Sequence, residues 1–150
     1  MEKKKAKMMT IYSIGHSNRS FEEFVSILKR YRIKQVVDVR RFPMSKVVPH
    51  FNRDVLEDGL QKHKIKYVYM GDVLGGFRKY GYKDYVKTQR FMRALLKLVE
   101  ISEKLPTVIM CTEALWFKCH RRYIADELVK LGWEVVHILA KDRTQRHKVR

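Results

Sequence analysis

Short apolar segments alternate along the chain with longer segments in which apolar side chains recur every three or four residues. The first pattern is typical of buried strands and the second of amphipathic helices. The predicted strands cover residues 10–14, 35–39, 66–70, 107–111 and 134–139. The predicted helices are one that begins after Ser20 and three that cover residues 52–63, 84–105 and 121–131.

Local signals support several of these boundaries. Ser20 and Glu23 have the spacing of a capping box at a helix start. Pro106 ends the third helix, and Gly132 is the expected residue just after the fourth. Residues 71–82 contain three further glycines after the first one and are predicted to form a loop rather than a helix.

Helical spacing also predicts which side chains face the core. We expect the following to be buried: Phe21, Phe24, Val25, Leu28, Val55, Leu56, Leu60, Phe91, Ala94, Leu95, Leu98, Ile101, Leu105, Ile124, Leu128 and Leu131.

The alternation of strands and helices predicts an α/β fold. Strands that read as nearly continuous apolar runs indicate a parallel sheet covered on both faces. We therefore expect one domain over residues 1–150: a doubly wound, mainly parallel sheet of about five strands, Rossmann-like, in three layers. Ligands of such folds bind beyond the carboxyl ends of the strands.

Reactive side chains follow the strands in this sequence and seldom precede them. Because parallel strands end at the same edge, we expect these residues to converge on one site. They are His16 and Ser17, then Asp38 and Arg40, then Gly75 and Gly76, then Cys111 and Glu113.

The two cysteines carry the most distinctive chemistry. Cys119 lies at the start of the fourth helix, where the helix dipole and the adjacent arginines favour a thiolate. His120 and Glu113 are suited to proton transfer, and Arg121 to anion binding. We interpret the group as a nucleophile, a redox thiol or an anion pocket. Two partly buried structural cysteines are the alternative.

Several familiar sites are disfavoured. Phe117 and Ala125 stand where a phosphatase loop of the C-x5-R type needs arginine. The two cysteines lack the spacing of a zinc site, although His16 or His137 could add a ligand. A disulfide between the cysteines is possible but unexpected in a reducing cytosol. The turn GHSNRS lacks the dinucleotide-binding glycines, and no P-loop is present. We predict no metal and no cofactor.

Two further groups allow two interpretations each. Asp38 within an apolar strand needs a partner, and Arg40 on the same face can supply it; the pair is structural, or Asp38 is an acid or base. Tyr80, Tyr82 and Tyr85 lie beside the basic residues Arg78, Lys79 and Lys83. They stack nucleic-acid bases, or they pack the loop itself.

The net charge of +17 indicates which classes of binding partner to expect. Residues 1–9 and 141–150, predicted to be basic tails, carry +3 and +4, which leaves +10 on the body. This favours an anionic small molecule or nucleic acid; a solvated, charge-rich surface of a heat-tolerant cytosolic protein is the alternative. No apolar run approaches the about 20 residues of a membrane span, and no signal peptide is recognisable, so we predict a cytoplasmic protein without membrane contact.

Six motifs, in order, resemble the domain-of-unknown-function family 488 over residues 10–138. They are TIYSIGHS at 10–17, VDVR at 37–40, Pro43-x-Ser45, LGG at 74–76, Tyr82-x-x-Tyr85, and Cys111-x-Glu113 with Cys119-His120-Arg121. The resemblance implies a compact α/β domain of bacterial and archaeal cytosol with no established reaction. Trp116-Phe117 stands where the family often has Pro-Trp, and Arg41 where serine is common.

Together these features predict an enzyme, of hydrolase or transferase type, that acts on a phosphate-bearing or nucleic-acid-related substrate. The alternative is a non-catalytic nucleic-acid-binding protein. The predicted catalytic residues are Cys119, His120, Glu113 and His16. The predicted binding residues are Arg40, Arg121, Ser17, Asp38, Ser45, Gly75, Gly76 and Cys111.

Overall fold

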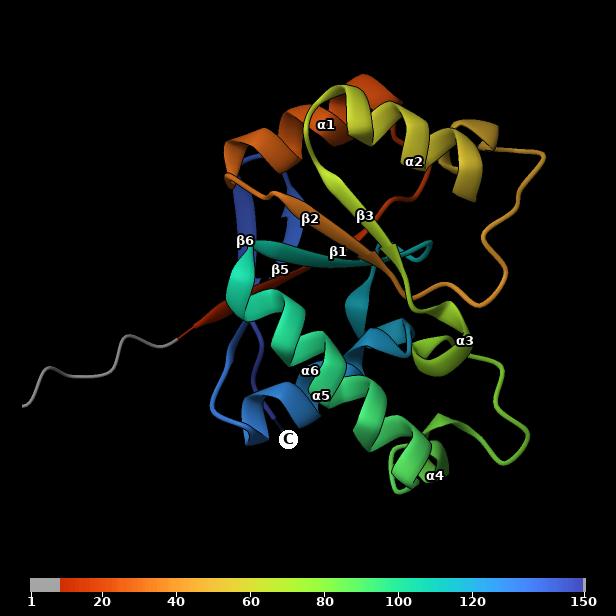
Figure 1. Cartoon of the computed structure of the whole chain (residues 1–150), viewed down its shortest axis with the longest axis vertical. Coiled ribbons are helices and arrows are strands. Elements are labelled where there is room, and N and C mark those ends of the chain that lie inside the picture. The colour runs from red at the N-terminus through yellow and green to blue at the C-terminus, as the bar shows by residue number, and fades with distance from the viewer. Residues whose placement is uncertain (1–8, 150) are drawn as a thin grey trace, which may run out of the picture.

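A six-stranded sheet in the order β3-β2-β4-β1-β5-β6 forms the centre of the computed structural model, which describes residues 9–149 (Figure 1). The strands are β1 (Thr10–Gly15), β2 (Gln35–Asp38), β3 (Lys66–Tyr69), β4 (Thr107–Cys111), β5 (Glu134–Ala140) and β6 (Arg143–Arg146). The helices are α1 (Phe21–Arg30), α2 (Arg53–Lys62), α3 (Gly71–Leu74), α4 (Tyr82–Tyr85), α5 (Gln89–Lys104) and α6 (Arg121–Lys130), with short 3-10 turns at Pro49–Phe51 and Trp116–Lys118.

The five predicted strands are present and pair in parallel. β1 lies between β4 and β5, and β2 lies between β3 and β4. Only the last pair, β5 with β6, is antiparallel within the described part of the chain. The prediction of a mainly parallel α/β sheet is therefore confirmed, with one strand more than expected.

Helices cover both faces of the sheet. Figure 1 shows α1 and α2 on one side and α5 and α6 on the other. Neighbouring strand residues alternate between the two cores: Val36 packs in the core with α1 and α2, and Val37 packs in the core with α5 and α6. This alternation follows from the two-residue repeat of a strand, which sends successive side chains to opposite faces.

The sixth strand lies within the segment predicted to be a basic tail. Residues 143–146 pair with β5, and the backbone N–H of His147 donates to the carbonyl of Val135 at 2.8 Å. All four side chains of β6 are exposed, so the strand has no apolar pattern and depends on edge pairing with β5. Residues 1–8 of the other predicted tail lie outside the described residues.

Two predicted boundaries are wrong. The expected loop over residues 71–82 contains the short helix α3. The expected continuous helix over residues 84–105 is divided into α4 and α5, because the Thr88 side chain accepts a hydrogen bond from the Phe91 backbone N–H and caps a new helix start.

The predicted helix faces are correct except at their edges. Leu56, Leu60 and Leu128 are fully buried, whereas Val55 and Leu131 are exposed, contrary to expectation. Each exposed side chain lies next to the buried stripe, where the pattern of apolar residues alone defines the face poorly. Gly132 follows α6 with a φ of +94°, as its predicted position requires.

Within residues 9–149, no helix combines the length and the hydropathy that crossing a membrane requires.

A pair of neighbouring substitutions on α2 checks these faces. Leu56→Ala should lower the free energy of unfolding by about 2–5 kcal/mol, because it opens a cavity in the core. Val55→Ala should change it by less than about 0.5 kcal/mol, because Val55 is 54% exposed. Urea denaturation measures both, and equal losses would contradict the assigned face.

Candidate active site

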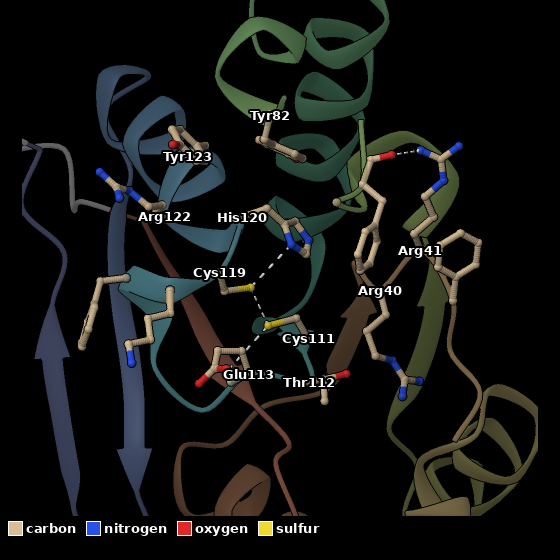
Figure 2. Close-up of a pocket in the computed structure, with 15 residues that line it drawn as sticks. Arg40, Arg41, Tyr82, Cys111, Thr112, Glu113, Cys119, His120, Arg122 and Tyr123 are labelled. Carbon is tan, nitrogen blue, oxygen red and sulfur yellow. Dashed lines mark hydrogen bonds between the residues drawn. The ribbon is translucent and has the colours of Figure 1, made fainter. Parts of the chain in front are cut away.

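An open pocket of about 510 Å³ lies at the carboxyl edge of the sheet. The chain leaves β2 towards β3 on one side and leaves β4 towards β5 on the other, so the crevice between β2 and β4 is the expected ligand position. Figure 2 shows Arg40 and Arg41 after β2 on one wall and, below, Cys111 at the end of β4 with Thr112 and Glu113 after it. The turn into α6 closes the other wall.

The two cysteines meet at the floor of this pocket. Cys111 ends β4 and is buried, and Cys119 lies just before the N-cap residue of α6. Their Sγ atoms are 2.8 Å apart, and both cysteines are free (Figure 2). The 3-10 turn at residues 116–118 returns the chain to β4, and so residues eight positions apart become direct neighbours.

The pair holds one negative charge, and Cys119 carries it. The hydrogen bond from the Cys111 thiol lowers the pKa of Cys119 most, and His120 and Arg121 lower it further. Burial opposes them, but the pKa still falls to about 3. Burial raises the pKa of Cys111, so Cys111 remains a thiol and donates its proton to the Cys119 thiolate.

His120 is oriented as a proton carrier for Cys119. Its Nε2 donates to the carbonyl of Val39 at 2.8 Å, which leaves Nδ1 facing Cys119 Sγ at 3.5 Å. A proton that leaves the thiol therefore has an acceptor in contact. Gly76 lines the pocket next to this ring, and a Cβ there would lie 3.3 Å from His120 Nδ1.

Arg121 lies behind the thiols and does not line the pocket. Its Nε donates to Cys111 Sγ at 2.9 Å, its Nη1 to Ser13 Oγ at 2.6 Å, and its Nη2 to the Glu113 carbonyl at 2.5 Å. The side chain predicted to bind an anionic ligand thus contacts the sulfur pair from inside the protein.

Asp38 and Arg40 form a buried ion pair. Arg40 Nε and Nη2 donate to the two carboxylate oxygens at 2.9 and 2.7 Å, and the Tyr67 hydroxyl donates to the second oxygen at 2.5 Å. These contacts occupy the carboxylate, as the structural interpretation of the pair expects. Arg40 also lines the pocket, whereas Asp38 does not.

His16 is a support for Arg40. Its Nε2 accepts from Arg40 Nη1 at 3.2 Å, and its Nδ1 donates to the Ser17 carbonyl at 2.8 Å. Burial lowers the pKa of His16 to about 4, so the ring is neutral at neutral pH. The ring stacks on Phe51 and lies outside the pocket lining.

Three other predicted binding residues shape loops. The Ser17 N–H donates to the Thr112 carbonyl at 2.9 Å, and Ser45 Oγ accepts from the backbone of Val47 and Val48. Gly75 packs against Arg41, where a side chain would collide with the backbone. None of the three predicted residues lines the pocket; Cys119, His120, Glu113, Arg40, Gly76 and Cys111 do.

The pocket also contains residues that were not among the predicted catalytic and binding residues. They are Arg41, Phe42, Phe77, Tyr82, Thr112, Phe117, Lys118, Arg122 and Tyr123. Adjacency gives a partial signal for the cations, because Arg41 and Arg122 directly follow Arg40 and Arg121. Among the aromatic residues, Tyr82 is marked by the Tyr82-x-x-Tyr85 motif, whereas Phe42, Phe77 and Tyr123 have no such signal.

The tyrosines of residues 80–85 divide between the two interpretations. The hydroxyl of Tyr82 donates to the Leu74 carbonyl at 2.8 Å, and that of Tyr85 donates to the Val73 carbonyl at 2.6 Å. These two pack the loop itself. Tyr80 is 76% exposed and remains available to a partner.

In the part of the chain that the structure describes, no three His, Cys, Asp or Glu side chains are grouped as metal ligands.

The thiolate is tested by alkylation of Cys119 with iodoacetamide at pH 5 to 8. Because its pKa is about 3, the rate should be nearly constant, whereas a free thiol with a pKa of about 8.5 loses about tenfold per pH unit. Cys111→Ala removes the proton donor and should raise the pKa of Cys119, so the rate at pH 5 should fall. A wild-type midpoint near 8.5 would refute the thiolate.

The buried ion pair is tested by Asp38→Ala. This change leaves Arg40 without its counter-charge and should lower the free energy of unfolding by about 3–5 kcal/mol. Tyr67→Phe removes only one hydrogen bond to the same carboxylate and should cost less. Urea denaturation at pH 7 compares the two, and equal costs would show that the pair contributes little.

Comparison with known proteins places these residues in a family. No curated protein matches the chain. The family model described as "Domain of unknown function DUF488" matches residues 20–128, well over half of the chain. The matched segment includes the Asp38–Arg40 pair, both cysteines and Arg121, whereas β1, β5 and β6 lie outside it. The chain therefore belongs to the DUF488 family, as the motifs predicted.

Proposed function

We propose that the protein is an enzyme that uses Cys119 as a nucleophile on an anionic, phosphate-bearing substrate. One observation carries the proposal: the Cys119 thiolate and His120 lie side by side at the floor of an open, positively charged pocket. An activated thiolate with an oriented imidazole in contact is the usual arrangement of thiol-based nucleophilic catalysis.

The contacts support a two-step group transfer. Cys119 Sγ forms a bond to the transferred group while the bond to the leaving atom breaks, and that atom takes the electron pair and the proton of His120 Nδ1. Water, or another acceptor, then loses its proton to Nδ1 and attacks the group, and the electron pair returns to Sγ. Glu113, which also lines the pocket, supplies a second proton acceptor.

The charge of the pocket favours an anion. Arg41, Lys118 and Arg122 line it together with Arg40, whereas Glu113 is the acidic residue of the lining. Arg40 is already paired with Asp38, so the other three cations remain for the ligand. Guanidinium groups suit phosphate oxygens because their N–H groups donate in pairs.

The walls of the pocket favour a substrate with a flat apolar part. Phe42, Phe77, Phe117 and Tyr123 contribute aromatic rings to the lining. Such rings stack on planar groups, as in nucleotide bases. A phosphate next to a planar ring therefore describes the ligand class that the pocket accommodates.

A second candidate function is non-catalytic binding of nucleic acid. Its specific support is the rim of the pocket, where Phe42 and Phe77 are 66% and 83% exposed and their ring centroids are 5.7 Å apart. Arg41 donates to the Phe77 carbonyl at 3.0 Å, and its guanidinium carbon is 5.9 Å from the centroid of the Phe42 ring, so a cation lies beside the two rings (Figure 2). Exposed rings with adjacent cations are typical of single-strand binding.

Protection of Cys119 from iodoacetamide tests the enzyme. Adenosine monophosphate should slow alkylation at lower concentrations than inorganic phosphate or adenosine, because it engages both the cations and the rings. Arg122→Ala should raise its half-protecting concentration about tenfold or more, the value of a hydrogen bond to a charged group. Arg93→Ala, on the exposed side of α5, is the matched control.

The outcomes separate the two functions. A panel of phosphate esters should include one that leaves a mass adduct on wild-type Cys119 and none on Cys119→Ser. If no phosphate compound protects or modifies Cys119, the proposed enzyme is wrong. Oligonucleotide binding that falls steeply with salt and is equal in wild type and Cys119→Ser would favour the binding protein.

A further inference from the structure

A chain of five buried or half-buried polar side chains runs behind the thiol pair. Asp126 Oδ1 is 2.6 Å from His147 Nε2, His147 Nδ1 is 2.9 Å from His137 Nε2, and His137 Nδ1 is 2.9 Å from Ser13 Oγ. Ser13 Oγ in turn accepts from Arg121 Nη1 at 2.6 Å. None of these five side chains lines the pocket that contains Cys119.

The end of this chain is a buried cation without a direct counter-ion. Arg121 is 1% exposed, and within residues 9–149 no carboxylate forms an ion pair with it. Its partners are a hydroxyl, a sulfur and backbone carbonyls. Burying a charge without compensation is costly, so Arg121 requires negative charge nearby.

The thiolate supplies that charge only in the free enzyme. In the proposed reaction, Cys119 Sγ gives an electron pair to the transferred group and becomes neutral. Arg121, which reaches the pair through Cys111 Sγ at 2.9 Å, then loses the nearest negative charge. Any charge on the transferred group lies in the pocket, which Arg121 does not line. A second source of negative charge on the inner side therefore stabilises Arg121 while the covalent intermediate exists.

The hydrogen bonds allow Asp126 to be that source. With Asp126 ionised, His147 Nε2 carries a proton and its Nδ1 accepts from His137 Nε2. His137 Nδ1 then accepts the hydroxyl proton of Ser13, whose oxygen accepts from Arg121. Burial lowers the pKa of His137 to about 3, which agrees with this neutral ring. Every bond is then polarised in one direction, from Arg121 to Asp126.

The surrounding structure holds the chain in this order. The indole of Trp116 stacks on His137 with ring centroids 4.4 Å apart, and its Nε1 donates to Gln145 Oε1 at 3.0 Å. His147 follows β6 and is fastened by its backbone bond to Val135. Asp126 on α6 keeps 27% of its side chain exposed, so water can solvate its charge.

We propose that Asp126, acting through His147, His137 and Ser13, compensates the buried charge of Arg121 while Cys119 is covalently occupied. The inference rests on the proposed function, because it assigns these side chains to the covalent state of that reaction. They are positioning residues, since none of them touches the substrate pocket.

A double-mutant cycle tests the coupling without any substrate. Cys111→Ser with Cys119→Ser keeps hydrogen-bonding groups at both positions but cannot ionise at neutral pH, and so imitates the neutral sulfur of the intermediate. Asp126→Asn removes the charge and keeps an oxygen that accepts from His147. Asp126→Asn lowers the equilibrium constant for folding by some factor in each background. That factor should be at least tenfold larger in the serine background than in the wild type, measured by urea denaturation at pH 7.

Two comparisons make the result decisive. Glu127→Gln removes the adjacent carboxylate of α6, which pairs with Lys130 at 2.8 Å, and should cost the same in both backgrounds. Ser13→Ala breaks the chain at its other end and should reproduce the coupling of Asp126→Asn. Equal losses for Asp126→Asn in the two backgrounds would overturn the proposal and indicate a purely structural network.

Failure of this proposal can be distinguished from failure of the proposed function. The pH profile of Cys119 alkylation and protection by adenosine monophosphate report on the nucleophile and its pocket. If both behave as expected and the cycle shows no coupling, the nucleophile stands and Asp126 does not compensate Arg121.

Discussion

The buried guanidinium of Arg121 joins the parts of this structure on which the site depends. Arg121 is the first residue of α6. Its guanidinium donates to Ser13 on β1, to Cys111 at the end of β4, and to the Glu113 carbonyl in the loop after β4. A planar group with fixed donor directions satisfies all three at once only when α6 meets the sheet at one position. That position brings Cys119 into contact with Cys111, and so the need to satisfy a buried cation also builds the thiol pair.

The site therefore has two layers. The outer layer is the pocket, which Cys119, His120 and the cations line. The inner layer is polar and closed: it contains Arg121, His137 within β5, His147 just after β6, and Asp38 and His16, which hold Arg40 at the pocket. Because hydrogen bonds and charges interact strongly where water is excluded, the inner layer sets which sulfur is ionised and which rings are neutral. The proposed chemistry in the outer layer depends on these states.

Much of the outer layer could be predicted from local sequence. The strands are recognisable as apolar runs, and the residues after them converge because parallel strands share a carboxyl edge. Cys119, His120, Glu113 and Arg40 are at the pocket for this reason. Local sequence does not predict which side chains of a loop point into the pocket. His16, Ser17 and Ser45 follow the same pattern, yet their contacts with Arg40 and with backbone groups turn them away from the pocket.

The sequence by itself determined the α/β sheet, the gathering of reactive residues at its carboxyl edge and the family, because periodicity and strand ends are properties of neighbouring residues. Only the tertiary structure decided that β6 exists, since its exposed side chains have no pattern and its hydrogen bonds come from β5. It also decided that Ser13, Asp126, His137 and His147 form one chain with Arg121. Those residues come from three separate elements and from the end of the chain, and no spacing between them predicts their contact.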